Sequence, residues 1–149
     1  MSSKPLAGKV ALVTGAGRNI GRAIAIALAA DGASVAVNAR SNIGELDAVV
    51  REIETAGGRA FAVPADVAVE SAVRSMVASV VERYGRLDIL VNNAALRRES
   101  PLSEIRYDEW RAVLATILDG AFFCVQACVP HLRTSGAGTI VNIGGLTGA

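Results

Sequence analysis

GKVALVTGAGRNIGRAIAIALAAD, residues 8–31, is the stretch that decides the fold. Its apolar run from Val10 to Val13 has the length and composition of a buried strand. A glycine-rich turn follows, and apolar residues then recur at three- and four-residue spacing, which predicts an amphipathic helix. The expected apolar face of that helix consists of Ile20, Ala23, Ile24, Ala27 and Leu28.

The turn between this strand and this helix is suited to hold a phosphate. Backbone N–H groups at the start of a helix point outward, and the helix dipole adds partial positive charge there. Gly15 and Gly21 let the backbone turn tightly and let a pyrophosphate come close without a Cβ in the way. Asn19 is the side chain that best tolerates left-handed backbone angles after glycine. A tight turn without any ligand is the alternative.

Composition extends this reading to the whole chain. The 149 residues are enough for one domain, and 52% of them are hydrophobic while only 4% are aromatic. Strands and helices alternate, and each strand is a continuous apolar run, which favours a doubly wound parallel sheet of the Rossmann type. The five expected strands cover residues 10–13, 34–39, 60–63, 88–91 and 139–143, and the later helices cover about 70–84 and 107–132.

Charge and apolar patterning argue against several classes of partner. The net charge is +1 without any basic run, so we expect neither nucleic acid nor an acidic membrane as a partner. No apolar run reaches the roughly 18 residues that span a bilayer, and we expect a cytoplasmic protein. Cys124, Cys128 and His131 share one apolar helical stretch, where we expect buried thiols and no metal site.

Ligands of doubly wound sheets bind beyond the carboxyl ends of the strands. Arg40 lies at the end of the second strand, 19 residues after Gly21, where an acidic residue would bind the ribose 2′-hydroxyl of NAD and an arginine accommodates the 2′-phosphate of NADP. Arg18 can reach the same phosphate from the glycine turn. Because two arginines converge on one pocket, the sequence predicts NADP(H) in preference to NAD(H). A solvated surface arginine is the alternative for Arg40.

Thr14-Gly15 and Gly21 resemble the TGxxxGxG fingerprint of the short-chain dehydrogenase/reductase family, with Asn19 in place of one glycine. The pair Asp66-Val67, the segment LDILVNNA and the segment IVNI recur in the family's order, so the resemblance covers nearly all of the chain. Together, the motif and the two arginines predict a cofactor site that includes Gly15, Arg18, Asn19, Ile20, Gly21, Arg40 and Ser41.

The resemblance also implies roles for two later turns. Asp66 would hold the adenine amino group with Val67 beside the ring, although Asp66 could equally cap the next helix. Asn93, Ala94 and Ala95 resemble the family's NNAG element, with Ala95 in place of glycine, and would lie along the cofactor's ribose. A purely structural role for that turn is the alternative, and both roles can hold together.

The resemblance fails where catalysis is expected. The family uses a Tyr-x-x-x-Lys pair, a serine and an asparagine, and the asparagine position falls on Ile117 while the serine position falls on Gly144 or Gly145. The tyrosine and lysine would lie beyond residue 149, so we expect no catalytic residue in this span. Ile117 extends an apolar stripe and is expected to pack. Thr147 is a candidate for the missing hydroxyl.

These motifs imply an NADP(H)-dependent oxidoreductase that interconverts a small-molecule carbonyl and an alcohol. We expect residues 1–149 to be a single dinucleotide-binding domain, truncated from a parent of about 250 residues that carries further strands and a helix. The family also implies a homo-oligomer, a dimer or tetramer. The alternative is a non-catalytic nucleotide-binding relative, which Ile117 and Gly145 favour.

Overall fold

The computed structural model describes residues 4–145 and is built on a five-stranded parallel sheet. The strand order is β3-β2-β1-β4-β5, and every neighbouring pair is parallel. The strand order reverses direction between β1 and β4, as in a doubly wound sheet, so the predicted fold class is confirmed. The strands are β1 (Val10–Val13), β2 (Ser34–Val37), β3 (Arg59–Ala62), β4 (Ile89–Asn92) and β5 (Thr139–Asn142), within one or two residues of the predicted ends.

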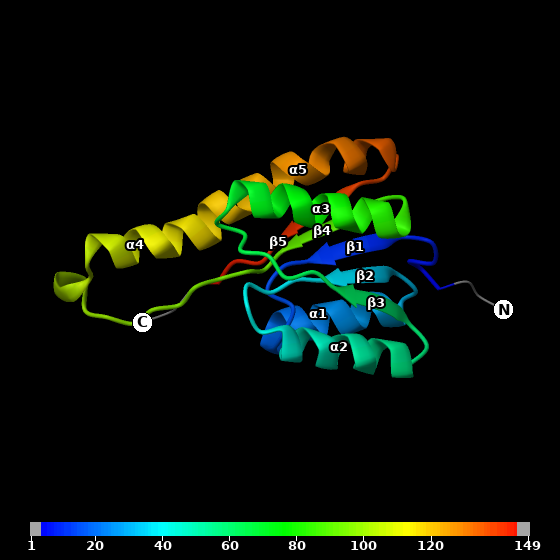
Figure 1. The fold of residues 1–149 in the computed structure, drawn as a ribbon, viewed down its shortest axis with the longest axis horizontal. Coiled ribbons are helices and arrows are strands. Elements are labelled where there is room, and N and C mark those ends of the chain that lie inside the picture. Colours follow the sequence, from blue (N-terminus) through cyan, green and yellow to red (C-terminus); the bar gives the residue numbers. More distant parts are fainter. Residues whose placement is uncertain (1–3, 146–149) are drawn as a thin grey trace.

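Helices cover both faces of the sheet (Figure 1). On one face α1 (Asn19–Ala30) and α2 (Ile43–Thr55) pack against the sheet through a core of small and branched side chains. On the other face α3 (Glu70–Tyr84) and α5 (Gly120–Thr134) pack against a second core. This two-sided burial explains why β1, β2 and β4 read as unbroken apolar runs, whereas β5, at the edge of the sheet, is exposed along its length.

The helix α1 approaches the sheet through smaller residues than the spacing predicted. Its buried positions are Gly21, Ala25 and Ala29, whereas Ile20 is 61% exposed. The predicted apolar face is therefore displaced by about one residue. Small side chains let the helix approach the strands closely, and Ile24 and Leu28 flank the contact half-buried.

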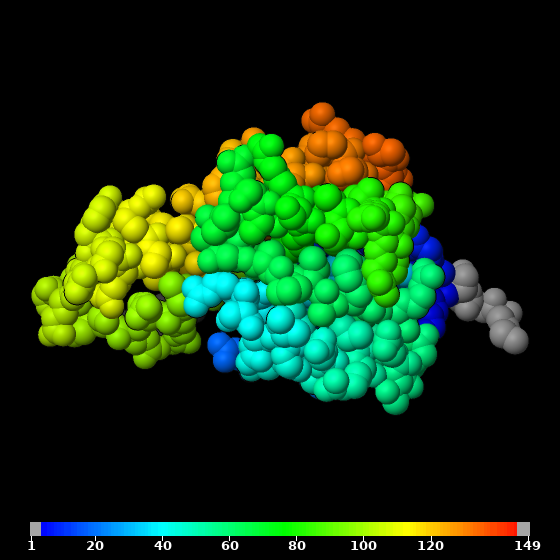
Figure 2. Space-filling model, in the orientation of Figure 1, coloured from blue at the N-terminus to red at the C-terminus, as the bar shows by residue number. Residues whose placement is uncertain are grey.

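The chain between β4 and α5 reaches beyond the sheet. After a short 3₁₀ turn (Leu102–Glu104), α4 (Tyr107–Leu114) and a π-helical turn (Ala115–Asp119) run into α5 as one long helix. Figures 1 and 2 show α4, in yellow, projecting past the carboxyl ends of the strands. The prediction that Ile117 packs is wrong among the described residues. Its exposed fraction is 48%, because the projecting part of the helix does not lie over the sheet.

This long helix also bears on the membrane prediction. Over its 28 residues, Tyr107–Thr134, it is long and apolar enough to cross a bilayer by length and composition. The sequence-based expectation, which counted only uninterrupted apolar runs, did not include such a segment. Mostly buried core helices of soluble proteins meet the same criterion, but only 17% of the apolar window is buried here. Cys124, Cys128 and Leu132, in the second half of the helix, are buried in the core.

The amino end of β4 is fixed by a buried carboxylate, Asp88. Its oxygens accept hydrogen bonds from the Val10 N–H at 2.9 Å and from the Arg86 guanidinium at 2.8 and 2.6 Å. Burial raises the pKa of this carboxyl, but these hydrogen bonds and the charges of Arg86 and Lys9 outweigh it and hold the pKa below its ordinary value. Asp88 thus ties β4 to β1 at the edge opposite the glycine turn.

Candidate functional site

The carboxyl ends of β1 and β4 bring the glycine turn against the Asn93–Ala94 segment. A Cβ built on Gly15 would lie 2.9 Å from the Ala94 Cα, so no side chain fits there. The Asn93 side-chain amide donates to the carbonyl oxygens of Thr14, at 3.1 Å, and Gly15, at 3.0 Å. The predicted turn residues Gly15, Asn93 and Ala94 therefore meet in one structure, with Ala95 exposed beside them.

Thr14 is the centre of this junction. Its hydroxyl accepts hydrogen bonds from the N–H groups of Asn93 and Ala94, both at 3.0 Å, and donates to the Val91 carbonyl at 3.3 Å. The side chain is 1% exposed. In the sequence Thr14 is visible only as part of a fingerprint, and a hydroxyl directly after an apolar strand is the signal for its role.

The second glycine of the turn is required by close backbone packing. A Cβ on Gly21 would lie 2.1 Å from the Gly15 carbonyl oxygen and 2.5 Å from the Asn93 side-chain nitrogen. Asn19 has φ +49°, the left-handed region, as its residue type predicted. The turn therefore keeps its shape with Asn19 in place of the family's glycine.

The amides of this turn are free to bind a ligand. Among residues 4–145, the N–H groups of residues 17–21 find no acceptor within the protein, and Arg18, the residue before α1, makes no capping bond with its side chain. The N–H of Ala16 is occupied, because it donates to the Asn38 carbonyl at 2.7 Å. A row of unpaired N–H groups at a helix N-terminus is an anion-binding arrangement.

Asn38 anchors the turn and was missed as a functional residue. It is 1% exposed, and its side-chain amide donates to the carbonyls of Val63, at 3.0 Å, and Ala65, at 3.1 Å. With its carbonyl on Ala16, it joins the ends of three neighbouring strands. A polar residue closing a buried strand was the signal in the sequence.

The two predicted arginines extend from neighbouring backbone segments. A Cβ on Gly17 would lie 3.9 Å from the Ala39 Cβ. The next residues along the chain, Arg18 and Arg40, therefore have backbones that lie close together. Both arginines are exposed, as is Ser41, and neither forms an ion pair with any other residue of the described chain. Figure 2 shows the segment after β2, in cyan, across a hollow from the projecting α4.

The turn after β3 has a clear structural role. The Asp66 carboxylate accepts the Ala68 N–H at 2.9 Å, a side-chain turn that lies before α3. The expectation that Asp66 could cap the helix is wrong, because the residue at the cap position is Val69 and no side chain among the described residues caps α3. Val67 is 5% exposed, and its Cγ2 would lie 2.7 Å from a Cβ on Gly120. The Asp66–Val67 turn is thus held against the first residue of α5, and its contact with adenine stays a prediction.

The positions expected to carry catalysis are open. A Cβ on Gly144 or on Gly145 would meet nothing within 4 Å among the described residues. The Asn92 side-chain amide donates to the Asn142 carboxamide oxygen at 2.9 Å and so joins the ends of β4 and β5 just before these glycines. Thr147, the candidate hydroxyl, lies outside the described residues.

The two cysteines are buried thiols. Burial raises the pKa of Cys124 to about 12, and burial together with the Cys124 charge raises the pKa of Cys128. Within the described part of the chain no three His, Cys, Asp or Glu side chains gather as a metal site would require. These thiols act as small core residues.

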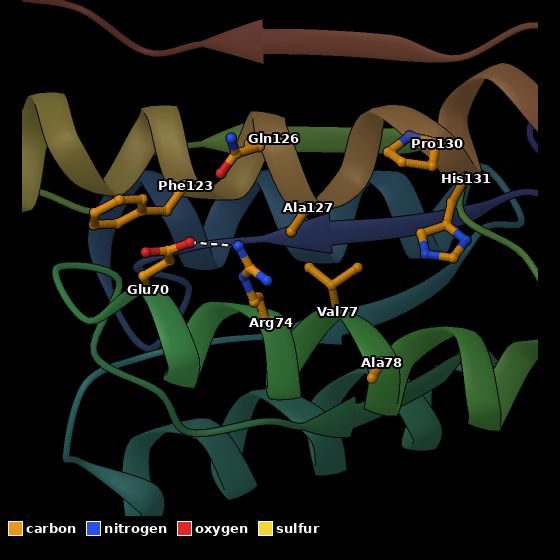
Figure 3. A pocket seen from close by; sticks show the side chains of 9 residues that line it. All are labelled: Glu70, Arg74, Val77, Ala78, Phe123, Gln126, Ala127, Pro130 and His131. Carbon is orange, nitrogen blue, oxygen red and sulfur yellow. Dashed lines mark hydrogen bonds and ion pairs between the residues drawn. The ribbon is translucent and has the colours of Figure 1, made fainter.

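A cavity of about 420 Å³ lies away from this edge, between α3 and α5 (Figure 3). Its walls include Phe123, Pro130 and His131, and the Glu70–Arg74 ion pair spans part of it. None of the predicted cofactor residues lines it. The row of free amides, and not this hollow, therefore defines the candidate site.

Known proteins are similar to this chain in sequence and in fold. A family model described as short chain dehydrogenase matches residues 9–149. The chain is 43% identical over 141 residues to "3-oxoacyl-[acyl-carrier-protein] reductase FabG" of Staphylococcus aureus (strain Mu50 / ATCC 700699), covering 95% of this chain and 57% of that protein. The chain spans a little over half the length of the curated relatives it matches.

Solved structures agree. A metagenomic short-chain oxidoreductase in complex with NADP superposes with a TM-score of 0.90 at 39% identity, covering 98% of this chain and 65% of that one. A short chain dehydrogenase from Burkholderia cenocepacia J2315 in complex with NADP gives 0.85 at 43% identity, over 92% and 55% of the two chains. With its glycine turn, its parallel sheet and these matches, the chain belongs to the short-chain dehydrogenase family.

Proposed function

We propose that this chain is the cofactor-binding part of an NADP(H)-dependent oxidoreductase that interconverts a carbonyl and an alcohol of a small molecule. The observation that carries the proposal is the row of N–H groups at residues 17–21, which have no acceptor in the described part of the chain and are flanked by the exposed guanidinium groups of Arg18 and Arg40. Free amides suit a pyrophosphate, and forked guanidinium donors suit a 2′-phosphate.

Different residues of the chain would bind different parts of the cofactor. Gly15 and Gly21 allow the close backbone packing that shapes the turn around the pyrophosphate site, while Arg18, Arg40 and Ser41 receive the 2′-phosphate. The turn through Asn93 and Ala94 borders the same edge of the sheet and would lie along the ribose. When bound, the cofactor supplies hydride chemistry at its nicotinamide ring.

The relatives favour an enzyme over the non-catalytic alternative. One is a reductase of 3-oxoacyl groups on acyl-carrier protein, and two structural neighbours are complexes with NADP. Since Ile117 and Gly145 supply no side-chain hydrogen bond, we propose that polar contacts to the substrate come from other parts of the whole protein. The substrate's identity depends on those parts as well.

A side-by-side titration tests the cofactor proposal. NADPH and NADH are titrated into the protein and into Arg40→Asp, with Arg51→Asp on the exposed side of α2 as a control of equal charge change. Losing a charge-assisted hydrogen bond and adding a repulsive carboxylate should weaken NADPH binding about 10- to 100-fold in Arg40→Asp, and little in Arg51→Asp. Equal affinity of the unmutated protein for both cofactors would contradict the NADP assignment.

The exposed apolar side chains of the long helix support a homo-oligomer. Trp110, Leu118 and Phe122 are 50%, 63% and 59% exposed, which is unusual for large apolar groups on one helix. We propose that a second copy covers them in a dimer or tetramer, and that the protein is cytoplasmic. Light scattering after gel filtration tests this, because Leu118→Glu should yield a smaller species and a monomeric unmutated protein would refute the proposal.

A further inference from the structure

We propose that Glu45 sets the cofactor preference of this site by placing a carboxylate where the 2′-phosphate of NADP(H) would bind. The inference rests on the proposed function and deepens it. It predicts a site that accepts both phosphorylated and unphosphorylated dinucleotides, with a preference for NADP(H) smaller than two arginines alone would give.

Local structure brings Glu45 to the site from the helix that follows β2. Asn42 precedes α2, and its side-chain oxygen accepts the Glu45 N–H at 3.3 Å, which fixes the first turn of the helix. Glu45 is half-buried there, in contrast to its exposed neighbours Gly44 and Asp47. Its side chain therefore turns inward, toward the glycine turn.

The contact with the glycine turn is close. A Cβ on Gly17 would lie 3.1 Å from Oε2 of Glu45, 3.3 Å from the Glu45 Cβ and 3.9 Å from the Ala39 Cβ. Three segments thus converge on one point: the glycine turn, the end of β2 and the first turn of α2. The absent side chain of Gly17 leaves the space that the carboxylate uses.

Both arginines begin one residue from this point. Arg18 follows Gly17 and Arg40 follows Ala39, yet among residues 4–145 neither is ion-paired with Glu45, nor is Glu45 paired with any other cation. The guanidinium groups and the carboxylate are therefore all available to a ligand arriving at this place. An acidic residue was absent from the end of β2 in the sequence, but the fold supplies one from the next helix.

The two kinds of group act oppositely on the two cofactors. A 2′-phosphate carries about −1.5 to −2 charges near neutral pH and is repelled by a carboxylate within one Debye length. A ribose 2′-hydroxyl can instead donate a hydrogen bond to a carboxylate. Glu45 consequently weakens the binding of NADPH and favours that of NADH.

The test compares dissociation constants for NADPH and NADH in the whole protein and in Glu45→Gln. The matched control is Glu54→Gln, an exposed glutamate on the same helix that removes the same charge away from the turn. We expect Glu45→Gln to bind NADPH roughly fivefold more tightly at low salt, with NADH unchanged or weaker. Glu54→Gln should change the NADPH-to-NADH ratio by less than about 1.5-fold, and high salt should reduce the effect of Glu45→Gln.

The possible outcomes separate this inference from the proposed function. If the unmutated protein binds neither cofactor, both the proposed function and the inference about Glu45 are wrong. If NADPH binds and Arg40→Asp weakens it, but Glu45→Gln leaves the ratio of the two affinities unchanged, only the inference fails. Far-UV circular dichroism and the urea midpoint of Glu45→Gln confirm that a changed ratio does not come from a damaged fold.

Discussion

The hydroxyl of Thr14 holds the glycine turn and the Asn93–Ala94 turn together, and its removal should be costly. In Thr14→Val the side chain keeps its shape but loses three hydrogen bonds, to the N–H groups of Asn93 and Ala94 and to the Val91 carbonyl. Leaving a buried polar group unpaired costs about 1–3 kcal/mol. The Val91 carbonyl keeps the hydrogen bond from the Thr14 N–H at 3.1 Å, so only the two N–H groups lose their partner, at about 2–6 kcal/mol in all. Because Asn93 and Ala94 are only half-buried, we place the loss near the lower end, at about 2–4 kcal/mol.

Urea unfolding at 25 °C measures this loss, with Thr14→Ser as the matched control. Serine keeps the oxygen and loses one methyl group, so it should cost only about 1 kcal/mol. Thr14→Val should also bind NADPH more weakly, because the Ala94 backbone packs directly on Gly15. A free energy of unfolding for Thr14→Val within 0.5 kcal/mol (about the error of the method) of that for Thr14→Ser would refute the reasoning.

Three further predictions concern other parts of the fold. Because the folded-state pKa of Asp88 is lowered, its contacts stabilise the protein above about pH 4, and this stability is lost as the pH falls through the folded pKa. Urea unfolding of Asp88→Asn should therefore give a free energy of unfolding about 2–3 kcal/mol lower than that of the unmutated protein at pH 7, and the difference should shrink toward pH 3. Gly120→Ala should displace Val67 and weaken binding of NADPH more than binding of nicotinamide mononucleotide, by calorimetry; an equal effect on both would contradict a link to the adenine end. Gly145 has room for a hydroxyl, so in the whole protein Gly145→Ser should raise kcat/KM for carbonyl reduction at least about tenfold by adding a hydrogen bond to the reacting oxygen. An unchanged steady-state rate would contradict this.

Local signals in the sequence were sufficient for the sheet and for the glycine turn. Each strand was a short apolar run, and α3 begins and ends at the predicted residues, Glu70 and Tyr84, because Gly85 takes the left-handed conformation that ends a helix. The left-handed angle of Asn19 followed from its residue type. In all these cases the neighbours in sequence are also the neighbours that determine the conformation.

The features that were missed depend on contacts between distant segments. Ile117 continues an apolar stripe, but periodicity does not reveal that α4 leaves the sheet and exposes that stripe. Glu45 looks like an ordinary first-turn glutamate, and its approach to Gly17 arises only when α2 packs beside α1. The same holds for Asn38, whose three partners come from the ends of neighbouring strands.

Asn38 also has a consequence for the kinetics of ligand capture. Its carbonyl holds the Ala16 N–H while its side chain is fixed by the segment that follows β3, so the start of the glycine turn is held against the sheet before any ligand binds. A loop that is already ordered loses little conformational entropy on association. Binding to this turn should therefore proceed without a slow rearrangement step, as a single exponential in stopped-flow fluorescence whose rate rises linearly with ligand concentration.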